Sequence, residues 1–344
     1  MKKEMLLRAL FLCVMLSAIL PGCKLDPPVY PSSETPATTP EPSNNNPNNS
    51  TALTASTVVS GSNKLPQPSR LCTTTDGTIY VTSMSQGKVF RVTSAGIVKL
   101  VAQGLNKPLG IKSDLNDNIY VAITGDNKII KITPSGKVTD VVINMPINGA
   151  QDLAIADDGS IYITDTGNKR ILKVSATGTA TVFAGKINVS GLKDGTGAGA
   201  HFSFPTNIRI AADGFIWVID GDGVNKSGQT IRRITKSGRV NTYYSSKKKA
   251  LAIIDLAVAR RDKALNSVLI GSLFLIFSDN TLSHLGTNGV ETVISPTTTS
   301  GLVNGDLKQA QFSKPTGISI SGNKMYIADQ NNDALRKIVS SKIN

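Results

Sequence analysis

Five aspartates of this 344-residue chain stand at the borders of short apolar runs. Asp165, Asp220 and Asp329 end the runs IYITD, IWVID and MYIAD, whereas Asp152 and Asp255 come directly before the runs LAI and LAV. Carboxylates that converge from several strands offer the hard oxygen ligands that calcium and magnesium prefer. Whether such a site exists depends on how the chain arranges these runs in space.

The sequence holds few residues for other kinds of catalysis. Only two histidines are present, His201 and His284, so a site with three histidine ligands is excluded. No segment has the pattern of a nucleophile elbow, a phosphate-binding loop or a paired-cysteine metal site. Cys72 lies in an expected strand, and we interpret it as a small packing residue. The residue types therefore favour binding over catalysis, and no catalytic residue is assigned.

The acids belong to a unit that the chain repeats, and residues 156–205 are its clearest copy. The segment DDGSIYITD predicts a turn followed by a strand, and KRILKVSATGTATVFAG predicts two further strands around a glycine turn. With the strand before the DDG turn, this makes an antiparallel meander of four strands. Such a meander cannot bury both of its faces alone, so it requires neighbours of its own kind.

Six copies of the unit align between residue 68 and the C-terminus. The sixth copy has no fourth strand, but residues 55–62, ASTVVSGS, match the fourth strands ATVFAG and ETVIS in type. A repeat that is divided between the two ends of a chain is typical of a β-propeller whose N-terminal strand closes the ring. We predict an all-β fold, a six-bladed β-propeller of four-stranded antiparallel blades that is closed by an N-terminal strand.

Several short motifs recur in the copies. They are the DG turns at Asp76, Asp158 and Asp213, the YITD-type segments, the NKRI segment at 168–171, and two linkers, residues 191–205 and 301–315, that share G-x-x-x-G and A-x-F-x-x-P spacing. These motifs resemble NHL repeats, and residues 55–344 look like a six-bladed NHL-type propeller. The fifth copy departs from the pattern because ARRDKALNS replaces its DG turn. The resemblance implies a fold but no chemistry, since propellers include binding modules and enzymes.

The propeller topology assigns each connection to one face of the ring. Linkers before the first strands and loops between the second and third strands share one face, which we call the long-loop face. The DG turns lie on the opposite face, the turn face. The longest connections, residues 186–205, 221–229 and 296–315, all fall on the long-loop face. Because long loops on a rigid ring commonly bind ligands, we predict binding there.

The same topology directs a set of polar residues to the bore at the long-loop face. The predicted bore residues are Asp152, Asp255, Arg70, Asn207, Asp165, Asp220 and Asp329. The acids of this set would hold calcium or magnesium, although the sequence assigns no metal. Alternatively, the acids that end the apolar runs serve their own blades. Asp165, for example, precedes Asn168 and Arg170, with which it would form hydrogen bonds.

Three further positions shape the predicted bore. Arg70 would pair with Asp152 or Asp255, or would bind an anionic group of a ligand. Gly110 and Gly317 leave two positions of the ring without side chains. Their absence either widens a pocket or relieves backbone strain.

Two kinds of propeller enzyme give the alternative function, a divalent-metal-dependent hydrolase or lyase that uses the acidic ring. Resemblance to gluconolactonases implies a metal set of Glu, Asn and Asp. Asn207, Asp152 and Asp255 match part of that set, but no Glu occupies a bore position. Resemblance to streptogramin lyases implies a catalytic histidine near the bore, where neither His201 nor His284 is expected.

The N-terminus has the features of a bacterial lipoprotein signal. MKKEMLLR is basic, and the apolar run over residues 9–20 is shorter than the roughly 20 residues that span a bilayer. It leads into LPGC, which resembles the lipoprotein box, so we predict lipid attachment at Cys23 after removal of residues 1–22. Residues 23–54, rich in Pro, Ser, Thr and Asn, predict a disordered tether. The residue directly after Cys23 is Lys24 and not Asp, which favours the outer membrane.

The chain is basic, with a net charge of +13, of which +11 remains after the signal with its Lys2, Lys3, Glu4 and Arg8. A basic surface attracts anionic partners in general. The clusters at 247–249 and 260–261 lack interleaved aromatics, so the sequence does not predict nucleic-acid binding. We expect a monomeric cell-envelope lipoprotein whose propeller is a non-catalytic binding or scaffold module for a protein or glycan partner.

Overall fold

The computed structural model describes residues 52–221, 230–246, 251–258 and 271–340. The predicted signal, Cys23 and nearly all of the predicted tether lie outside these residues, as do residues 222–229 of one predicted long loop and the ARRDKALNS segment. Within the described residues, no helix is both long and apolar enough to cross a membrane.

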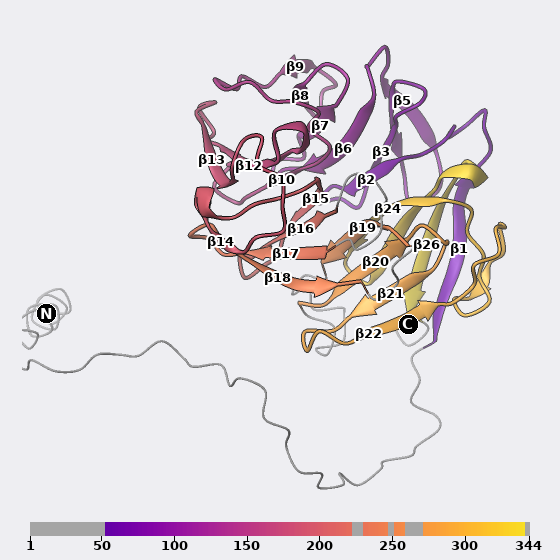
Figure 1. Ribbon diagram of the computed structural model, residues 1–344. Helices are drawn as coiled ribbons and strands as arrows, with labels where there is room; N and C mark the ends of the chain where they lie inside the picture. Colours follow the sequence, from indigo (N-terminus) through magenta and orange to yellow (C-terminus); the bar gives the residue numbers. More distant parts are fainter. Residues whose placement is uncertain (1–51, 222–229, 247–250, 259–270, 341–344) are drawn as a thin grey trace, which may run out of the picture. The chain divides into compact units, whose positions relative to one another are not determined.

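Six antiparallel sheets surround a central axis, as Figure 1 shows, and this confirms the predicted all-β, six-bladed propeller. Blades 1 and 2 contain β2 (Arg70–Thr73), β3 (Ile79–Ser83), β4 (Lys88–Val92), β5 (Val98–Ala102), β6 (Pro108–Ser113), β7 (Ile119–Ile123), β8 (Lys128–Ile132) and β9 (Val138–Asp140). Blades 3 and 4 contain β10 (Leu153–Ile155), β11 (Ile161–Asp165), β12 (Arg170–Val174), β13 (Ala180–Gly185), β15 (Pro205–Ile210), β16 (Ile216–Asp220), β17 (Thr230–Ile234) and β18 (Arg239–Ser245).

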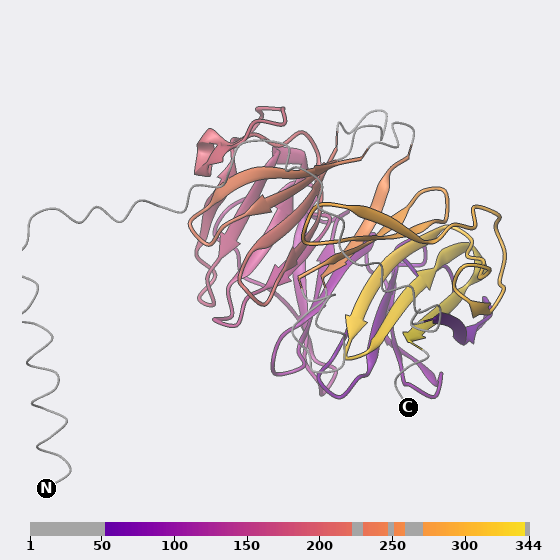
Figure 2. The same cartoon turned by 90° about the horizontal axis from the view of Figure 1, so that it is seen from below.

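The remaining blades complete the ring. Blade 5 contains β19 (Ile253–Val258), β20 (Leu273–Phe277), β21 (Leu282–Leu285) and β22 (Glu291–Ser295), and blade 6 contains β24 (Pro315–Ser321), β25 (Lys324–Asp329), β26 (Ala334–Ser340) and β1 (Leu53–Ser60). Short 3-10 turns are η1 (Thr166–Asn168), η2 (Gly197–Gly199) and η4 (Gln330–Asn332). In Figure 2 the sheets appear as separate blades that are inclined to one another.

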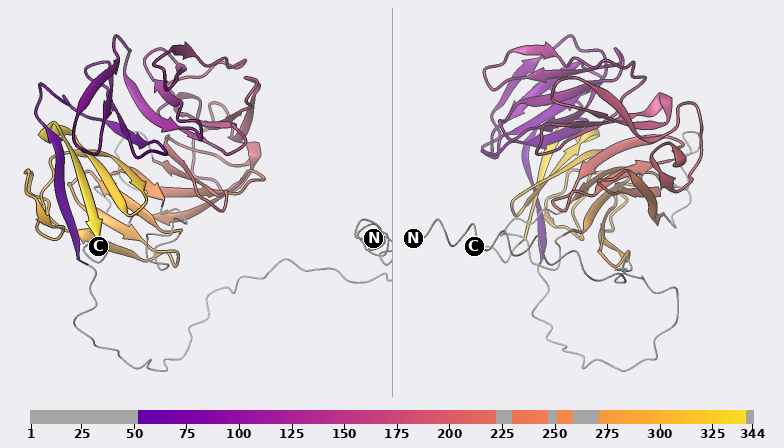
Figure 3. Two further views of the ribbon diagram at one scale, coloured as in Figure 1. Left: turned by 180° about the vertical axis from the view of Figure 1, so that it is seen from behind. Right: turned by 90° about the vertical axis from the view of Figure 1, so that its left-hand side faces the viewer.

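The N-terminal strand β1 closes the ring by completing blade 6. It pairs antiparallel with β26, from Thr54 opposite Val339 to Ser60 opposite Ala334. Figure 3 shows this strand, in indigo, beside the yellow strands of the C-terminus. The strand begins at Leu53, two residues before the predicted start, so the last residues of the predicted tether already belong to the sheet. This pairing covers the edge of β26, which would otherwise be unpaired.

Apolar clusters lie at all six interfaces between neighbouring blades, including the interface between blades 6 and 1. Successive strand residues point to opposite faces, and each face of a blade meets a neighbour. This explains why all five residues of LFLIF in β20 are buried. The mid-strand aromatics also pack between blades; they are Tyr80, Tyr120, Tyr162, Trp217 and Tyr326.

Two long linkers, residues 191–205 and 301–315, each add a short fifth strand to a blade. β14 (Gly195–Thr196) pairs with β18 of blade 4, and β23 (Gly305–Asp306) pairs with β1 of blade 6. Phe202 and Phe312, the phenylalanines of the A-x-F-x-x-P spacing, are fully buried and anchor the linkers. The linkers therefore cover the outer edges of two blades, where they protect backbone groups from pairing with another chain.

Candidate functional site

The bore is lined by the first strand of every blade, and β2, β6, β10, β15, β19 and β24 contact one another in a closed circle. Residues two positions apart on a strand face the same side, so the bore has layers. The upper layer, nearest the long-loop face, holds Arg70, Gly110, Asp152, Asn207, Asp255 and Gly317. The lower layer holds Cys72, Lys112, Ala154, Arg209, Ala257 and Ser319.

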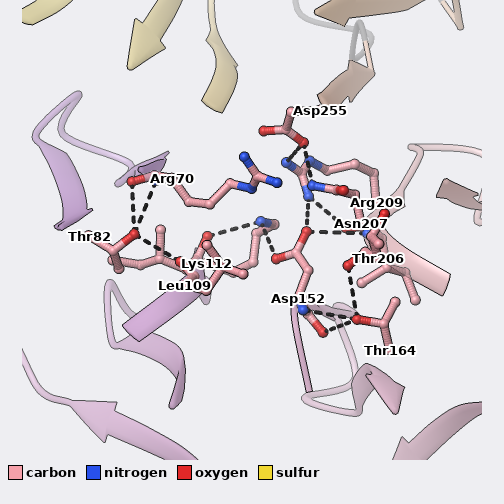
Figure 4. A network of polar contacts seen from close by, with 12 residues as sticks. Arg70, Thr82, Leu109, Lys112, Asp152, Thr164, Thr206, Asn207, Arg209 and Asp255 are labelled. Atoms are coloured by element: carbon pink, nitrogen blue, oxygen red, sulfur yellow. Dashed lines mark hydrogen bonds and ion pairs between the residues drawn. The ribbon is translucent and has the colours of Figure 1, made fainter. Parts of the chain in front are cut away.

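Arg209 of the lower layer joins the two acids of the upper layer (Figure 4). Its Nη1 donates to a carboxylate oxygen of Asp152, and its Nη2 donates to Oδ1 of Asp255 at 2.6 Å. Lys112 Nζ donates to the other oxygen of Asp152 at 3.1 Å. Both carboxylates are only 1% exposed. These charged residues form what we call the bore network, which links blades 2, 3, 4 and 5.

Neutral donors complete the coordination of the two acids. Asn207 Nδ2 donates to Oδ1 of Asp255 at 3.0 Å, and the N–H of Ile318 donates to Oδ2 of Asp255 at 3.0 Å. The N–H of Ile208 donates to Oδ2 of Asp152 at 3.2 Å. The predicted bore residues Asp152, Asp255 and Asn207 are thus brought together, but by hydrogen bonds and ion pairs within the protein.

Arg70 lies in the same ring without pairing with either acid. Its Nη2 donates to the carbonyl oxygen of Ile254 at 3.0 Å, and its Nε is buried with no partner among the described residues. The predicted pairing with Asp152 or Asp255 is therefore wrong, because Arg209 and other donors already occupy those carboxylates. In Figure 4 the Arg70 guanidinium points toward the centre of the network.

The charged side chains of the bore shift one another's pKa values. Burial by itself would raise the pKa of Asp152, but Lys112, Arg209 and Arg70 outweigh burial and the pKa is lowered. Burial and the neighbouring Arg209 lower the pKa of Lys112. Burial also raises the pKa of the Cys72 thiol to about 12, which makes this cysteine a poor nucleophile. The free thiol of Cys72 is buried, in line with its predicted packing role.

The two glycines of the upper layer allow neighbouring blades to approach closely. A Cβ on Gly110 would lie 2.5 Å from both Cα and Oδ1 of Asp152. A Cβ on Gly317 would lie 3.0 Å from Cα of Arg70. Their missing side chains therefore make room for the next blade and do not widen a pocket.

The three acids that end the second strands are not part of the bore network. They are Asp165, Asp220 and Asp329. Asp329, for example, accepts hydrogen bonds from the N–H of Ser313 at 2.7 Å, Asn332 Nδ2 at 2.8 Å and Arg336 Nη1 at 2.9 Å. These donors come from the same blade and from the linker before it. We call this arrangement, an acid of the second strand with an arginine of the third, a blade clamp.

The other two blade clamps follow the same plan. Asp165 accepts from Arg170 Nε at 2.7 Å and from Asn168, as the sequence spacing predicts. Asp220 accepts from Arg232 Nη1 at 3.0 Å, and burial raises the pKa of Asp220 to about 6. The prediction that these acids converge with Asp152 and Asp255 is thus wrong, because an arginine of each blade and the N–H groups of its linker hold them in place.

The arginines of two clamps also fix the long linkers. Arg336 Nη2 donates to the carbonyl oxygen of Val303 at 2.7 Å, and its Nη1 donates to that of Gln311 at 2.8 Å. Arg232 makes the equivalent bonds to Lys193 and His201 of the other linker. Both arginine side chains are 0% exposed. The linkers are therefore rigid parts of the blades.

A cavity of about 150 Å³ lies beside the bore network and includes Lys112 and Arg209 in its lining. It shares Thr73 and Ser113 with a wider space of about 510 Å³, whose lining includes Asp114 and other residues of the first turns. The hollow part of the bore thus opens on the turn face. We predicted binding on the opposite, long-loop face.

The described residues contain no group of three or more His, Cys, Asp or Glu side chains that could hold a metal ion. Asp152 and Asp255 come nearest to the predicted metal site. Their carboxylate oxygens, however, already accept hydrogen bonds from cationic side chains and from backbone N–H groups. Calcium or magnesium would have to displace Arg209, whose planar guanidinium group already bridges the two carboxylates.

Residues 148–174 match the NHL repeat family model. The chain carries an NHL repeat. This segment contains the complete clamp of blade 3, with Asp165 and its partners Asn148, Asn168 and Arg170. A comparison with curated protein sequences gives no match.

Solved structures with a similar fold differ in what they do. An auxiliary nutrient binding protein from Bacteroides ovatus shares 15% identity over 85% of this chain and 78% of its own, with a TM-score of 0.65. A gluconolactonase from Xanthomonas campestris shares 11% over 83% and 89%, with a TM-score of 0.60. A catalytically inactive His-to-Ala virginiamycin B lyase from Staphylococcus aureus with quinupristin shares 20% over 79% and 80%, with a TM-score of 0.54. At these identities the likeness concerns the fold alone.

Sequence reasoning missed Lys112 and Arg209, the two cations that organise the bore. Both follow a predicted bore position, Gly110 or Asn207, by two residues on the same strand. Strand alternation therefore carried the signal, since residues i and i+2 face the same side. His284 lies on β21 with its ring 5.2 Å from that of Phe274, away from the bore layers.

Proposed function

We propose that this protein is a cell-envelope lipoprotein whose NHL-type propeller binds a protein or glycan partner through its long-loop face and does not transform it. The observation that carries the proposal is the repeated presentation of one apolar side chain by two rigid linkers. Leu192 and Leu302 occupy the same position after Gly191 and Gly301, and each is 43% exposed.

The linkers offer a surface that is already ordered before a partner arrives. Residues just after each leucine are bonded to a fully buried arginine, at 2.9 Å for Lys193 O to Arg232 and 2.7 Å for Val303 O to Arg336. Ordering a loop on binding costs conformational entropy, and a rigid loop avoids that cost. Two exposed leucines on one ring fit a protein partner better than a short sugar, because apolar burial is the dominant favourable term in most protein–protein association.

The bore supports binding over catalysis, because both acids that could act there are already ion-paired. Asp152 and Asp255 each bind Arg209, and Asp152 also binds Lys112. A hydrolase or lyase that uses a divalent metal would need these carboxylates free. Melting of the protein with and without calcium, magnesium or zinc tests this part of the proposal. A stoichiometric metal that is lost in Asp152→Asn would contradict it.

Photo-crosslinking tests the long-loop face directly. A photoreactive amino acid at position 192 or 302 of the full chain, produced in cells, is expected to give the same discrete adduct from both positions. Position 290 serves as the matched control, because Val290 is also exposed, at 57%, but lies in the turn between β21 and β22. Equal adducts from all three positions, or none from 192 and 302, would contradict the proposal.

The envelope anchor rests on Cys23 and is tested separately. We expect the full chain to incorporate labelled palmitate and to partition into detergent from the outer membrane. Cys23→Ala should abolish both while the propeller still folds. Incorporation that persists in this variant would show that the lipid is attached elsewhere.

A further inference from the structure

The bore network carries more positive than negative charge. Arg70, Lys112 and Arg209 place three cations around two carboxylates, Asp152 and Asp255. All five side chains are buried or nearly so. Buried charges are stable when they are paired, and this arrangement leaves one positive charge without an anionic partner among the described residues.

Two donors in this region are not used by the protein. Arg70 is only 9% exposed, yet its Nε has no hydrogen-bond partner among the described residues. The ammonium group of Lys112 has three hydrogens, and it donates to the carbonyl oxygen of Ile111 at 3.0 Å and to Asp152 at 3.1 Å. One Lys112 donor is left for another acceptor. Burial and Arg209 lower the pKa of Lys112 by more than Asp152 and Asp255 raise it.

An empty space adjoins Lys112, because most of the other lower-layer side chains are small. They are Cys72, Ala154, Ala257 and Ser319. The resulting cavity of about 150 Å³ is lined by Lys112 and Arg209 and by aliphatic residues such as Ile155 and Ile320. No acidic side chain among the described residues lines it. A lining that combines cationic and aliphatic side chains fits a molecule with an anionic head and an apolar body.

We propose that this cavity binds a small organic monoanion, a carboxylate whose apolar body extends toward the turn face. The carboxylate accepts the unused hydrogen of Lys112 and supplies the missing negative charge of the bore. Two acids near the mouth, Asp114 and the exposed Asp157, disfavour a second negative group farther along the ligand. The site lies on the opposite face from the proposed partner surface and does not depend on it.

Calorimetric titration of the full chain with hexanoate in low-chloride buffer tests the proposal. We expect one site per chain and about fourfold tighter binding for each methylene added between butyrate and hexanoate. Hexanamide and hexylamine should bind at least tenfold more weakly than hexanoate, and so should succinate. Three results would overturn the proposal: hexanamide binding as tightly as hexanoate, chloride binding as tightly as hexanoate, or no binding of any monocarboxylate.

Two variants locate the site within the bore. Ala154→Leu fills the cavity without removing a charged group, and we expect it to abolish hexanoate binding while the adduct from position 192 persists. Ala212→Leu, at an exposed alanine of the turn face, is the matched control and should bind hexanoate as the parent does. If Ala154→Leu does not fold, Ser319→Leu fills the same cavity from blade 6. A folded filling variant that still binds hexanoate would overturn the proposal.

The charge requirement is tested at Lys112. Lys112→Met should weaken hexanoate binding at least tenfold, whereas Lys112→Arg should retain it within a few-fold. A variant series that depends on side-chain volume but not on charge would show that the cavity binds apolar molecules without recognising the anion.

Discussion

Asp329 of a blade clamp and Asp152 of the bore network are both fully buried and both paired with an arginine, but their partners come from different distances along the chain. Arg336 follows Asp329 by seven residues and lies on the next strand of the same blade. Arg209 follows Asp152 by 57 residues and belongs to the next blade. One arrangement stabilises a blade and its linker, and the other stabilises the contact between blades.

The two settings also treat charge differently. Each clamp arginine pairs with one buried acid of its own blade and also donates to at least one carbonyl oxygen of the connection before that blade. Arg209 divides its hydrogens between two acids from two blades, Asp152 and Asp255. Loss of a clamp should therefore have a local effect, whereas loss of Arg209 should affect the ring as a whole.

The largest effect is expected from Arg209→Met. This change leaves two buried carboxylates without their shared cation, and breaking a buried pair typically costs about 3–5 kcal/mol. We expect the free energy of unfolding, measured by urea denaturation, to fall by at least that amount. Adding Asp152→Asn and Asp255→Asn should recover part of the loss, because neither buried carboxylate is then left without its cation. An Arg209→Met protein as stable as the parent would remove the distinction between network and clamp.

A smaller and more local effect is expected from Arg336→Met. It leaves one acid, Asp329, and three linker acceptors without their donor, at a cost of up to about 3–5 kcal/mol. Hydrogen exchange should accelerate in residues 301–314 and stay unchanged in residues 191–204. Arg232→Met is the matched variant and should show the reverse pattern. Acceleration throughout all six blades in either variant would mean that the clamps are not local.

The pH dependence of stability should have opposite signs for the two kinds of acid. The pKa of Asp152 is lowered from 3.8, so its contribution is present above pH 3.8 and is lost as the pH falls through the lower folded value. The pKa of Asp220 is raised to about 6, so its contribution increases as the pH falls from about 6 toward 3.8. One pKa unit corresponds to about 1.4 kcal/mol.

Denaturation curves between pH 7 and pH 3 measure both contributions. Relative to the parent, Asp220→Asn should lack the gain between pH 6 and pH 4, and Asp152→Asn should lack the loss below pH 4. Carboxyl-carbon NMR titration provides an independent check. Equal pKa values for Asp152 and Asp220 would show that bore and clamp do not differ in electrostatics.

The smallest effect is expected from an exposed ion pair that resembles neither setting. Lys128 and Asp140 approach to 3.1 Å with exposures of 41% and 65%. Solvent screens such a pair, so Asp140→Asn should change the free energy of unfolding by less than about 0.5 kcal/mol. Urea denaturation of this variant sets the baseline for the buried pairs. A loss comparable with that of Arg336→Met would mean that burial is not what distinguishes these acids.

The sequence predicted the blades well because their signals are local. Turns, strand periodicity and the divided sixth repeat indicated the ring and its closure, and β1 began within two residues of the predicted start. The partners of Asp165 were also predicted, because Asn168 and Arg170 lie within five residues of it. For Asp220, whose arginine lies 12 residues away beyond a loop, the same reasoning named no partner.

The bore was harder to predict because its partners meet only when the ring closes. The sequence placed Asp152, Asp255 and Asn207 in the bore but could not find the partner of the two acids, since Arg209 reaches them from 57 and 46 positions away. From the sequence we also predicted only a binding role for the long connections. The structure shows that the linkers at 191–205 and 301–315 first serve as fifth strands held by clamp arginines.

What the sequence determined by itself is the set of blades, their closure and one clamp, because these depend on strand periodicity and on neighbours within a few residues. What only the tertiary structure decided is the content of the bore. The circle of first strands stacks side chains from residues tens of positions apart into layers, and the size of those side chains leaves a cavity on the turn face. Charge balance across that circle, and not any single motif, sets which acids are neutralised and which cation is left over.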